Sequence, residues 1–353
     1  MLQPQRARSS ASVVRLERQW YVACDSRSLG SAPLRRDILG TPLCLFRGSD
    51  GRAAALLDRC PHRNVPLTFG KVIDGELQCG YHGWRFNGAG ACLAVPGLCG
   101  EEQTRGRAAT IFPSIEQDGF VWVFLSTEIE PEGEPFRFPH LGDRGYTTVR
   151  RRVSAESTLH AAIENALDVP HTAFLHGGLF RTEQKRNEIE AVVRVQGDRV
   201  EAEYLGEPRP TGIAARILSP SGGMVTHFDR FILPSIAQVE YALGSENHFV
   251  VTTAMTPVSD FETVLHAVVS YRLRLPNWLV RPFLEPVAKK IFRQDAEILR
   301  LQAETIQRFG GEDFISTEID ILGRHIWKLM RQAAKGEPLE GNPPVEQRVR
   351  LLV

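Results

Sequence analysis

The first third of the chain alternates short apolar runs with turn residues, which is typical of a small antiparallel β domain. Apolar runs over 20–23, 42–46 and 53–57 predict strands, with the Ser49-Asp50-Gly51 turn before the last of them. The run 119–125 contains no polar residue, so neither face of a strand there would be polar, which predicts a strand buried on both faces. A Pro- and Glu-rich stretch over 128–139 then predicts a linker.

The pattern after this linker changes to mixed helices and longer strands. Residues 154–168 have the periodicity of a helix, and 192–204 predict a hairpin about the Gly197-Asp198 turn. Further strands are expected near 223–233, 235–243, 247–257 and 262–275, and helices over about 285–309 and 316–334. The chain is therefore predicted to be an α+β protein with two domains.

Composition narrows the function classes without identifying one. The chain has 353 residues, 42% of them hydrophobic and 24% charged, and its formal net charge is zero. This balance gives no electrostatic case for binding nucleic acid. No apolar run is long enough to cross a bilayer and no secretory signal begins the chain, so we expect a cytoplasmic protein with a disordered tail over 1–14. Cys92 and Cys99 are expected to be free thiols in a reducing compartment.

Two short motifs, C-P-H-R at 60–63 and C-G-Y-H-G-W at 79–84, each pair one cysteine with one histidine. Two thiolates and two imidazoles from separate loops suit a Rieske [2Fe–2S] centre, in which Cys binds one iron and His the other. Structural zinc is the alternative, but zinc sites usually place two like ligands close together. The motifs thus predict Cys60, His62, Cys79 and His82 as ligands of a cluster that transfers single electrons.

A second constellation lies in the predicted helical stretch 164–176. At about 100° per residue, Glu164, Asp168 and His171 share one face, whereas His176 lies about 140° round from His171. The two imidazoles can converge on one ion only if the helix breaks. Pro170 and the Gly177-Gly178 pair supply residues that would break it.

A third carboxylate candidate lies in the predicted helix 285–309. Asp295 falls in the middle of an apolar stripe, within about 60° of Ile291, Ile298 and Leu299, whereas Glu297 and Glu304 face the opposite way. An inward carboxylate is costly without a partner, and a metal ion is one such partner. A buried salt bridge is the alternative. Gln302 lies on the same side as Asp295.

These motifs resemble those of Rieske non-haem iron oxygenases, the aromatic-ring-hydroxylating oxygenase alpha-subunit family, in its homotrimeric monooxygenase-like branch. Asp168, His171 and His176 match the family motif D-x-x-H-x4-H, with Asn165 three residues before the aspartate. Respiratory-chain Rieske proteins carry an extra cysteine in each cluster loop, and 63–67 and 80–85 contain none. The resemblance implies a mononuclear Fe(II) held by His171, His176 and Asp295.

The resemblance also implies a role for Asp168, which would lie between the iron and the cluster ligand His82 of an adjacent subunit in a trimer. Asn165 is expected beside the iron site from the motif, and Glu164 and Gln302 are expected there from their helix faces.

The implied architecture is an antiparallel β Rieske [2Fe–2S] domain over 15–138, followed by a helix-grip (START/Bet v 1-like) catalytic domain over 139–353. The implied activity is O2-dependent hydroxylation, demethylation or desaturation of a small hydrophobic, ring-containing substrate. No G-x-G-x-x-G fingerprint occurs, so NAD(P)H is expected to act through a separate reductase, with or without a ferredoxin. The alternative is a Rieske electron carrier fused to a hydrophobic-ligand-binding domain without oxygenase activity.

Overall fold

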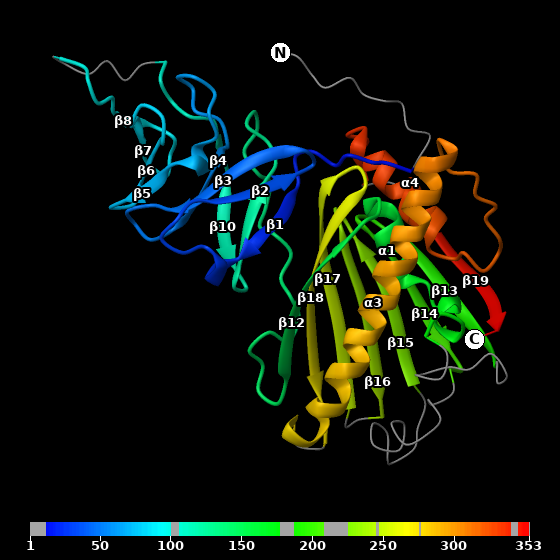
Figure 1. Ribbon diagram of the computed structural model, residues 1–353. Helices are drawn as coiled ribbons and strands as arrows, with labels where there is room; N and C mark the ends of the chain where they lie inside the picture. The colour runs from blue at the N-terminus through cyan, green and yellow to red at the C-terminus, as the bar shows by residue number, and fades with distance from the viewer. Residues whose placement is uncertain are drawn as a thin grey trace. The chain divides into compact units, whose positions relative to one another are not determined.

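The computed structural model describes residues 12–99, 106–176, 187–207, 225–244, 247–274, 277–339 and 345–352. The chain divides into two compact units (Figure 1). The first covers Leu16–Arg137, and the second contains the chain from Phe138 onwards together with the described residues before Leu16. Most of the predicted tail over 1–14 lies outside the described residues.

The first unit is built from three small antiparallel sheets, with strand orders β1-β11-β10, β2-β3-β4-β9 and β5-β6-β7-β8. Two short 3-10 helices, η1 (Ser26–Ser28) and η2 (Leu67–Phe69), join strands. The strands are β1 (Trp20–Asp25), β2 (Leu34–Ile38), β3 (Thr41–Arg47), β4 (Ala53–Leu57), β5 (Lys71–Ile73), β6 (Glu76–Gln78), β7 (Arg85–Phe86), β8 (Cys92–Ala94), β9 (Ile111–Phe112), β10 (Ser114–Gln117) and β11 (Phe120–Phe124).

The interior of this unit anchors the loops that carry the Cys-His motifs. All five residues of β11 are buried, which confirms the strand expected from the continuous apolar run. A second buried cluster contains Phe46, Leu56 and Phe86 together with Cys60 and Cys79. Burial of each large apolar side chain contributes about 1.5–3 kcal/mol. The cysteines therefore lie in well-packed surroundings, as preorganised metal ligands require.

The second unit is an eight-stranded antiparallel sheet with helices on one face (Figure 1). The strand order is β12-β18-β17-β16-β15-β14-β13-β19. The strands are β12 (Thr147–Ala155), β13 (Glu188–Gln196), β14 (Arg199–Leu205), β15 (Val225–Ile232), β16 (Ile236–Leu243), β17 (Asn247–Ser259), β18 (Glu262–Arg272) and β19 (Val345–Leu352). The helices are α1 (Leu159–Leu167), η3 (Pro170–Ala173), α3 (Asn277–Phe309) and α4 (Gly323–Ala334). Helix α1 packs against β15–β18, and α3 contacts β12 and α1.

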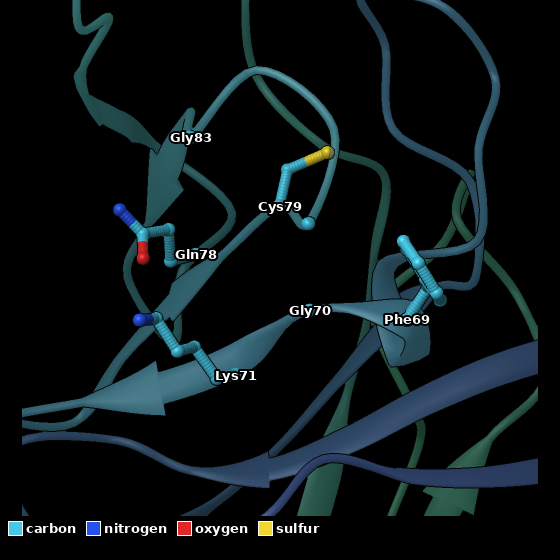
Figure 2. Close-up of a pocket in the computed structure, with 7 residues that line it drawn as sticks. Phe69, Gly70, Lys71, Gln78, Cys79 and Gly83 are labelled. Atoms are coloured by element: carbon cyan, nitrogen blue, oxygen red, sulfur yellow. The ribbon is translucent and has the colours of Figure 1, made fainter.

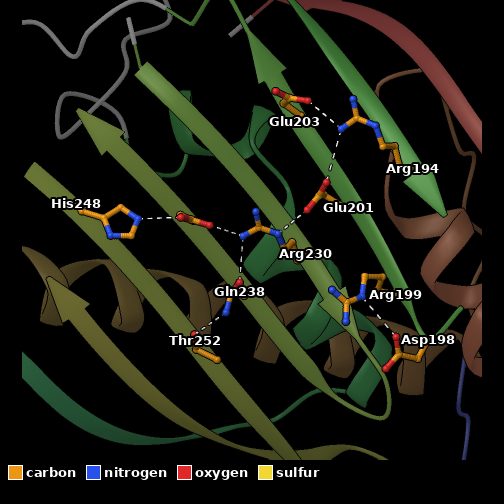
Figure 3. Close-up of polar contacts among 10 residues, drawn as sticks. Arg194, Asp198, Arg199, Glu201, Glu203, Arg230, Gln238, His248 and Thr252 are labelled. Atoms are coloured by element: carbon orange, nitrogen blue, oxygen red, sulfur yellow. Dashed lines mark hydrogen bonds and ion pairs between the residues drawn. The ribbon is translucent and has the colours of Figure 1, made fainter. Parts of the chain in front are cut away.

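The two faces of this sheet differ in chemistry because side chains alternate along each strand. On the face away from the helices, Arg230 pairs with Glu201 and Glu240, and Arg194 pairs with Glu201 and Glu203 (Figure 3). His227 and Tyr204 lie on the opposite face and are almost fully buried. Ion pairs cover the polar face of the sheet. A buried functional site is therefore expected on the face that the helices cover.

Several element boundaries differ from the sequence-based predictions. Helix α1 begins at Leu159 rather than 154, because 154–155 still belong to β12 and the Thr158 side chain accepts a hydrogen bond from the Ala161 N–H. Helix α3 begins earlier than 285, and α4 begins later than 316, at Gly323. Ile298, predicted to face inward, is 42% exposed, whereas Leu299 is buried. The buried stripe of α3 is therefore narrower than the periodicity indicates.

Candidate metal centres

The four residues of the Cys-His motifs lie together in the first unit. Cys60 and His62 are in the loop after β4, and Cys79 and His82 are in the loop between β6 and β7. The His62 and His82 ring centroids are 4.5 Å apart, and Cys60 and Cys79 belong to the same buried cluster. Both cysteines are buried, whereas His82 is exposed. One end of the site is therefore closed and the imidazole end is open.

Both loops fold back onto their own cysteine. The Cys79 N–H donates to Trp84 O at 2.8 Å, and the Gly83 N–H donates to Cys79 O at 3.1 Å. In the first loop, the Cys60 N–H donates to Val65 O and the Asn64 N–H donates to Cys60 O, both at 2.9 Å. Gly83 has a φ of 73°, which favours glycine. The tight turns hold each cysteine in one orientation.

Glycines also let neighbouring chain segments approach the second loop (Figure 2). A Cβ atom on Gly70 would lie 2.0 Å from Gln78 O, and one on Gly80 would lie 2.7 Å from Phe69 O. These segments border a hollow of about 300 Å³ beside Cys79, with Phe69 and Lys71 in its lining. Side chains at either glycine would push the η2 segment away from the cysteine loop.

The donor set fits a [2Fe–2S] cluster. The His62 Nδ1 atom is buried and has no hydrogen-bond partner, as expected of an atom that binds metal. Burial raises the pKa of the Cys60 thiol to about 11, so a thiolate at this position needs a cation beside it. Two soft thiolates and two imidazoles, in separate pairs, satisfy the ligand requirements of a Rieske centre.

The second constellation brings three residues together in the other unit. His171, His176 and Asp295 each offer one ligand atom within 4.8 Å of the others. The His171 and His176 Nε2 atoms are 3.3 Å apart, and Asp295 Oδ1 lies 3.7 Å from the first and 3.0 Å from the second. Two ligands at right angles and about 2.1 Å from one ion lie about 3 Å apart. The spacing therefore suits three ligands on one face of a single ion.

The chain break that this geometry requires lies earlier than the sequence predicts. Helix α1 ends at Leu167, and Asp168 already has an extended backbone (φ −89°, ψ 110°). Pro170 then opens the short helix η3 that carries His171. Consequently Asp168 and His171 do not share a helix face with Glu164. The predicted breaker at Gly177-Gly178 lies outside the described residues.

Asp168 holds His171 by two hydrogen bonds. Its Oδ2 atom accepts the backbone N–H and the Nδ1–H of His171, both at 3.1 Å. This arrangement leaves Nε2 of His171 directed at His176 and Asp295. Carboxylate–histidine–metal arrangements of this kind fix the tautomer and orientation of a ligating imidazole.

Gln294 does the same for His176, and the sequence analysis missed it. The His176 Nδ1 atom lies 3.2 Å from Gln294 Oε1, and Gln294 Nε2 donates to Leu175 O at 2.8 Å. The backbone carbonyl thus fixes the amide so that its oxygen accepts from the imidazole. The only signal in the sequence was its position next to Asp295.

The electrostatics of the three residues suit a cation. Burial lowers the pKa of His171, but the hydrogen bond to Asp168 and the nearby carboxylate of Asp295 outweigh it and raise the pKa to about 9. The Asp295 Oδ1 atom is buried and lacks a hydrogen-bond partner of good geometry. Two carboxylates around two imidazoles, with one orphaned carboxylate oxygen, fit Fe(II) in a two-histidine, one-carboxylate site.

Three further residues were expected around this centre. Glu164 packs directly against Gly323, because a Cβ atom on that glycine would lie 1.8 Å from Glu164 Oε1. Burial, together with the charges of Asp320, Asp168 and Glu312, raises the pKa of Glu164 to about 7. Asn165 and Gln302 are half-buried. Among the described residues, neither forms a hydrogen bond with the three candidate ligands.

The structure also reveals a buried ionic cluster that the sequence did not predict. His227 lies 2.7 Å from Glu207 Oε2 through Nδ1 and 3.1 Å from Asp229 Oδ1 through Nε2. Its ring stacks between Tyr204 and Tyr241, with centroids 4.4 and 4.0 Å away. Burial lowers the pKa of His227, but the two carboxylates outweigh it and raise the pKa to about 9.

Comparisons with known proteins show the family of each part of the chain. Residues 19–104 match the family model of the Rieske [2Fe-2S] domain. Residues 155–336, more than half of the chain, match the vanillate O-demethylase oxygenase C-terminal domain. The oxygenase component of dicamba O-demethylase from Stenotrophomonas maltophilia is 36% identical over 179 residues, which are 49% of this chain and 52% of that protein. The vanillate O-demethylase oxygenase subunit of Pseudomonas sp. is 32% identical over 192 residues, 51% of this chain and 50% of that protein.

The chain thus spans about half the length of the curated relatives it matches. Among solved structures, dicamba monooxygenase bound to 3,6-dichlorosalicylic acid superposes with a TM-score of 0.78 at 23% identity, covering 92% of this chain and 98% of that one. Pseudomonas putida CBB5 NdmA superposes with a TM-score of 0.74 at 20% identity, covering 94% and 96%. These likenesses confirm the predicted fold class, an antiparallel β Rieske domain followed by a sheet-rich domain with helices.

Proposed function

Because the chain belongs to the family of the vanillate O-demethylase oxygenase C-terminal domain, preceded by a Rieske [2Fe-2S] domain, we propose that it is a Rieske-type oxygenase component. We place the Rieske domain at 15–138 and a helix-grip catalytic domain, in which α3 lies across the curved sheet, at 139–353. The observation that carries the proposal is the convergence of His171, His176 and Asp295 in the same chain as a complete set of cluster ligands.

The residues of the two centres divide the work. Cys60, His62, Cys79 and His82 would hold the cluster, and His171, His176 and Asp295 would hold the iron at which O2 is used. When bound, the cluster supplies single electrons and the iron activates O2 for oxidation of the substrate. Gln294 and Asp168 keep the two imidazoles in the tautomer that presents Nε2.

We assign Asp168 the further role of linking the two centres. Its carboxylate already accepts from His171, it is 31% exposed, and the imidazole of His82 is exposed at the surface of the Rieske domain. An Asp168 that also accepts from His82 of a neighbouring copy would connect cluster and iron through hydrogen bonds. Such a head-to-tail contact closes into a ring, and a homotrimer meets this requirement.

The electron source is proposed from a sequence motif that the chain lacks, and the substrate class from the names of its relatives. The sequence contains no dinucleotide fingerprint, so a separate reductase, with or without a ferredoxin, supplies electrons from NAD(P)H. The named relatives include O-demethylases of dicamba and vanillate and a 3-chlorobenzoate-3,4-dioxygenase. A small hydrophobic, ring-containing substrate is therefore proposed, oxidised by hydroxylation, demethylation or desaturation. Among the described residues, no helix has the length and apolar character needed to span a bilayer.

Iron stoichiometry and O2 uptake test the proposal together. Purified chain reconstituted anaerobically should bind about three irons, two in the cluster and one at His171, His176 and Asp295. With a surrogate reductase and NADH, O2 uptake should rise when a ring compound from an apolar panel is added. About two irons per chain, with substrate-independent O2 uptake, would instead support an electron carrier fused to a ligand-binding domain.

A further inference from the structure

An arginine outside both cluster motifs lies over the ligand-bearing face of the Rieske domain. The Trp84 indole stacks on the His62 imidazole, with ring centroids 4.8 Å apart and an interplanar angle of 5°. On the Trp84 ring lies the guanidinium of Arg107, with its Cζ atom 5.9 Å from the ring centroid. The three groups form a cation–π–imidazole stack that ends at a candidate cluster ligand.

No counter-ion of Arg107 lies among the described residues. Arg47 of the same domain, in contrast, pairs with Glu116. The Arg107 Nη1 atom is buried and has no hydrogen-bond partner. Arg107 as a whole is half-buried, and its buried, unpaired donor makes a negative group nearby favourable.

We propose that Arg107, positioned by Trp84, sets the reduction potential of the cluster. Reduction adds one negative charge to a centre of which His62 is a ligand, and a fixed positive charge nearby favours that state. Trp84 contacts both groups, so the indole fills part of the space between the guanidinium and the imidazole that water would otherwise occupy. The inference rests on the cluster that the proposed function assigns to this domain, and it is independent of substrate oxidation.

The size of the effect follows from the stacking distances. The two separations place the guanidinium within about 11 Å of the imidazole ring. Coulomb's law at that distance, with an effective dielectric constant of about 20, changes the reduction equilibrium about tenfold. A tenfold change corresponds to about 59 mV for a one-electron couple. Loss of the charge should therefore lower the potential by about 60 mV.

Potentiometric titration of the full-length protein, followed by the visible absorbance of the cluster, tests this assignment. We expect R107Q to lower the potential by about 60 mV and R107K, which keeps the charge, to lower it by less than half as much. R52Q is the matched control, because it removes the same charge from a side chain that is 89% exposed in the same domain. Raising the salt concentration should erase any R52Q shift and leave the R107Q shift largely intact.

Two results would overturn the assignment. One is an R107Q potential equal to that of the wild type at equal cluster content. The other is an equal shift in R107Q and R107K, which would make the effect one of packing rather than charge. The cluster absorbance of each variant, measured before titration, shows whether the variant has folded and assembled its cluster, so that neither result can be mistaken for misfolding. A wild-type protein that assembles no cluster would contradict the proposed function itself.

Discussion

Replacing Asp168 with asparagine isolates the charge that the proposed link between the centres requires. Asparagine has the same shape as aspartate. Its carbonyl oxygen can still accept hydrogen bonds from the backbone N–H and Nδ1–H of His171, which lie 3.1 Å from Oδ2 in the wild type. A hydrogen bond to a charged partner contributes about 1.5–3 kcal/mol and one to a neutral partner about 0.5–1.5 kcal/mol, so the change costs about 1–2 kcal/mol. Iron affinity should therefore fall about tenfold, which excess Fe(II) can overcome.

Turnover should not recover with the iron. If the carboxylate also carries electrons between cluster and iron, D168N saturated with Fe(II) should turn over about 10- to 100-fold more slowly than the wild type. Stopped-flow reoxidation of the prereduced cluster, in the presence of substrate and O2, measures this step directly. Wild-type reoxidation in iron-saturated D168N would refute the linking role. If the turnover of D168N recovered in strict proportion to its iron content, the only role left for Asp168 would be to orient His171.

The chain supplies a close control for this experiment. Asp143 lies 2.9 Å from His140 Nδ1, in another aspartate–histidine pair three residues apart, but its side chain is 59% exposed and it is remote in sequence from either motif. D143N removes the same charge from the same kind of pair. It should leave iron content, cluster reoxidation and turnover unchanged, since an exposed pair contributes about 0–1 kcal/mol.

Three further predictions test ligation, loop packing and the buried histidine. D295N should lose the mononuclear iron while keeping the cluster, whereas E297Q on the exposed side of α3 should keep both; metal analysis of the two variants decides this. G70A should lower cluster content, because its Cβ atom would overlap Gln78 O and overpacking costs about 1–3 kcal/mol, whereas G30A, with nothing within 4 Å, should not. The folded-state pKa of His227 is raised to about 9, so its contribution to stability is complete below about pH 6.5 and is lost as the pH rises through 9. Urea unfolding across this range should show a loss that is larger in the wild type than in H227Q by on the order of 3 kcal/mol.

The four candidate cluster ligands can be picked out from the sequence because they lie in two short motifs, and the structure brings these motifs together. The structure also brings His171, His176 and Asp295 together, but on a different backbone from the one that the sequence predicts. The helix was expected to continue to His171, whereas α1 ends at Leu167. The break falls at Asp168, two residues before Pro170, whereas Val169 between them has helical backbone angles. There the Asp168 side chain accepts a hydrogen bond from the His171 backbone N–H. Helical periodicity cannot show that a side-chain hydrogen bond to the backbone ends the helix early.

Periodicity also identified Asp295 for a reason that the structure supports only in part. The stripe argument placed Ile298 inward beside it, but Ile298 is 42% exposed and Asp295 itself is only about four-fifths buried. Gln294 was passed over, although it contacts His176 directly. A helix residue adjacent to a ligand is about 100° away from it, so it contacts the site only when the partner lies on that side. The position of His176 depends on the chain break, which no pattern in α3 encodes.

The residues that support the candidate ligands share one property: each contacts its ligand from the side away from the metal. Trp84 stacks on His62, Asp168 holds Nδ1 of His171, and Gln294 holds Nδ1 of His176. Ligand motifs are constrained by the metal, so they recur at fixed spacings, whereas a supporting group can come from any element that happens to pass behind the imidazole. Arg107 extends this logic one layer further from the cluster. Potentials and metal affinities are therefore expected to vary among proteins with identical motifs, and the variation should track these supporting positions rather than the ligands themselves.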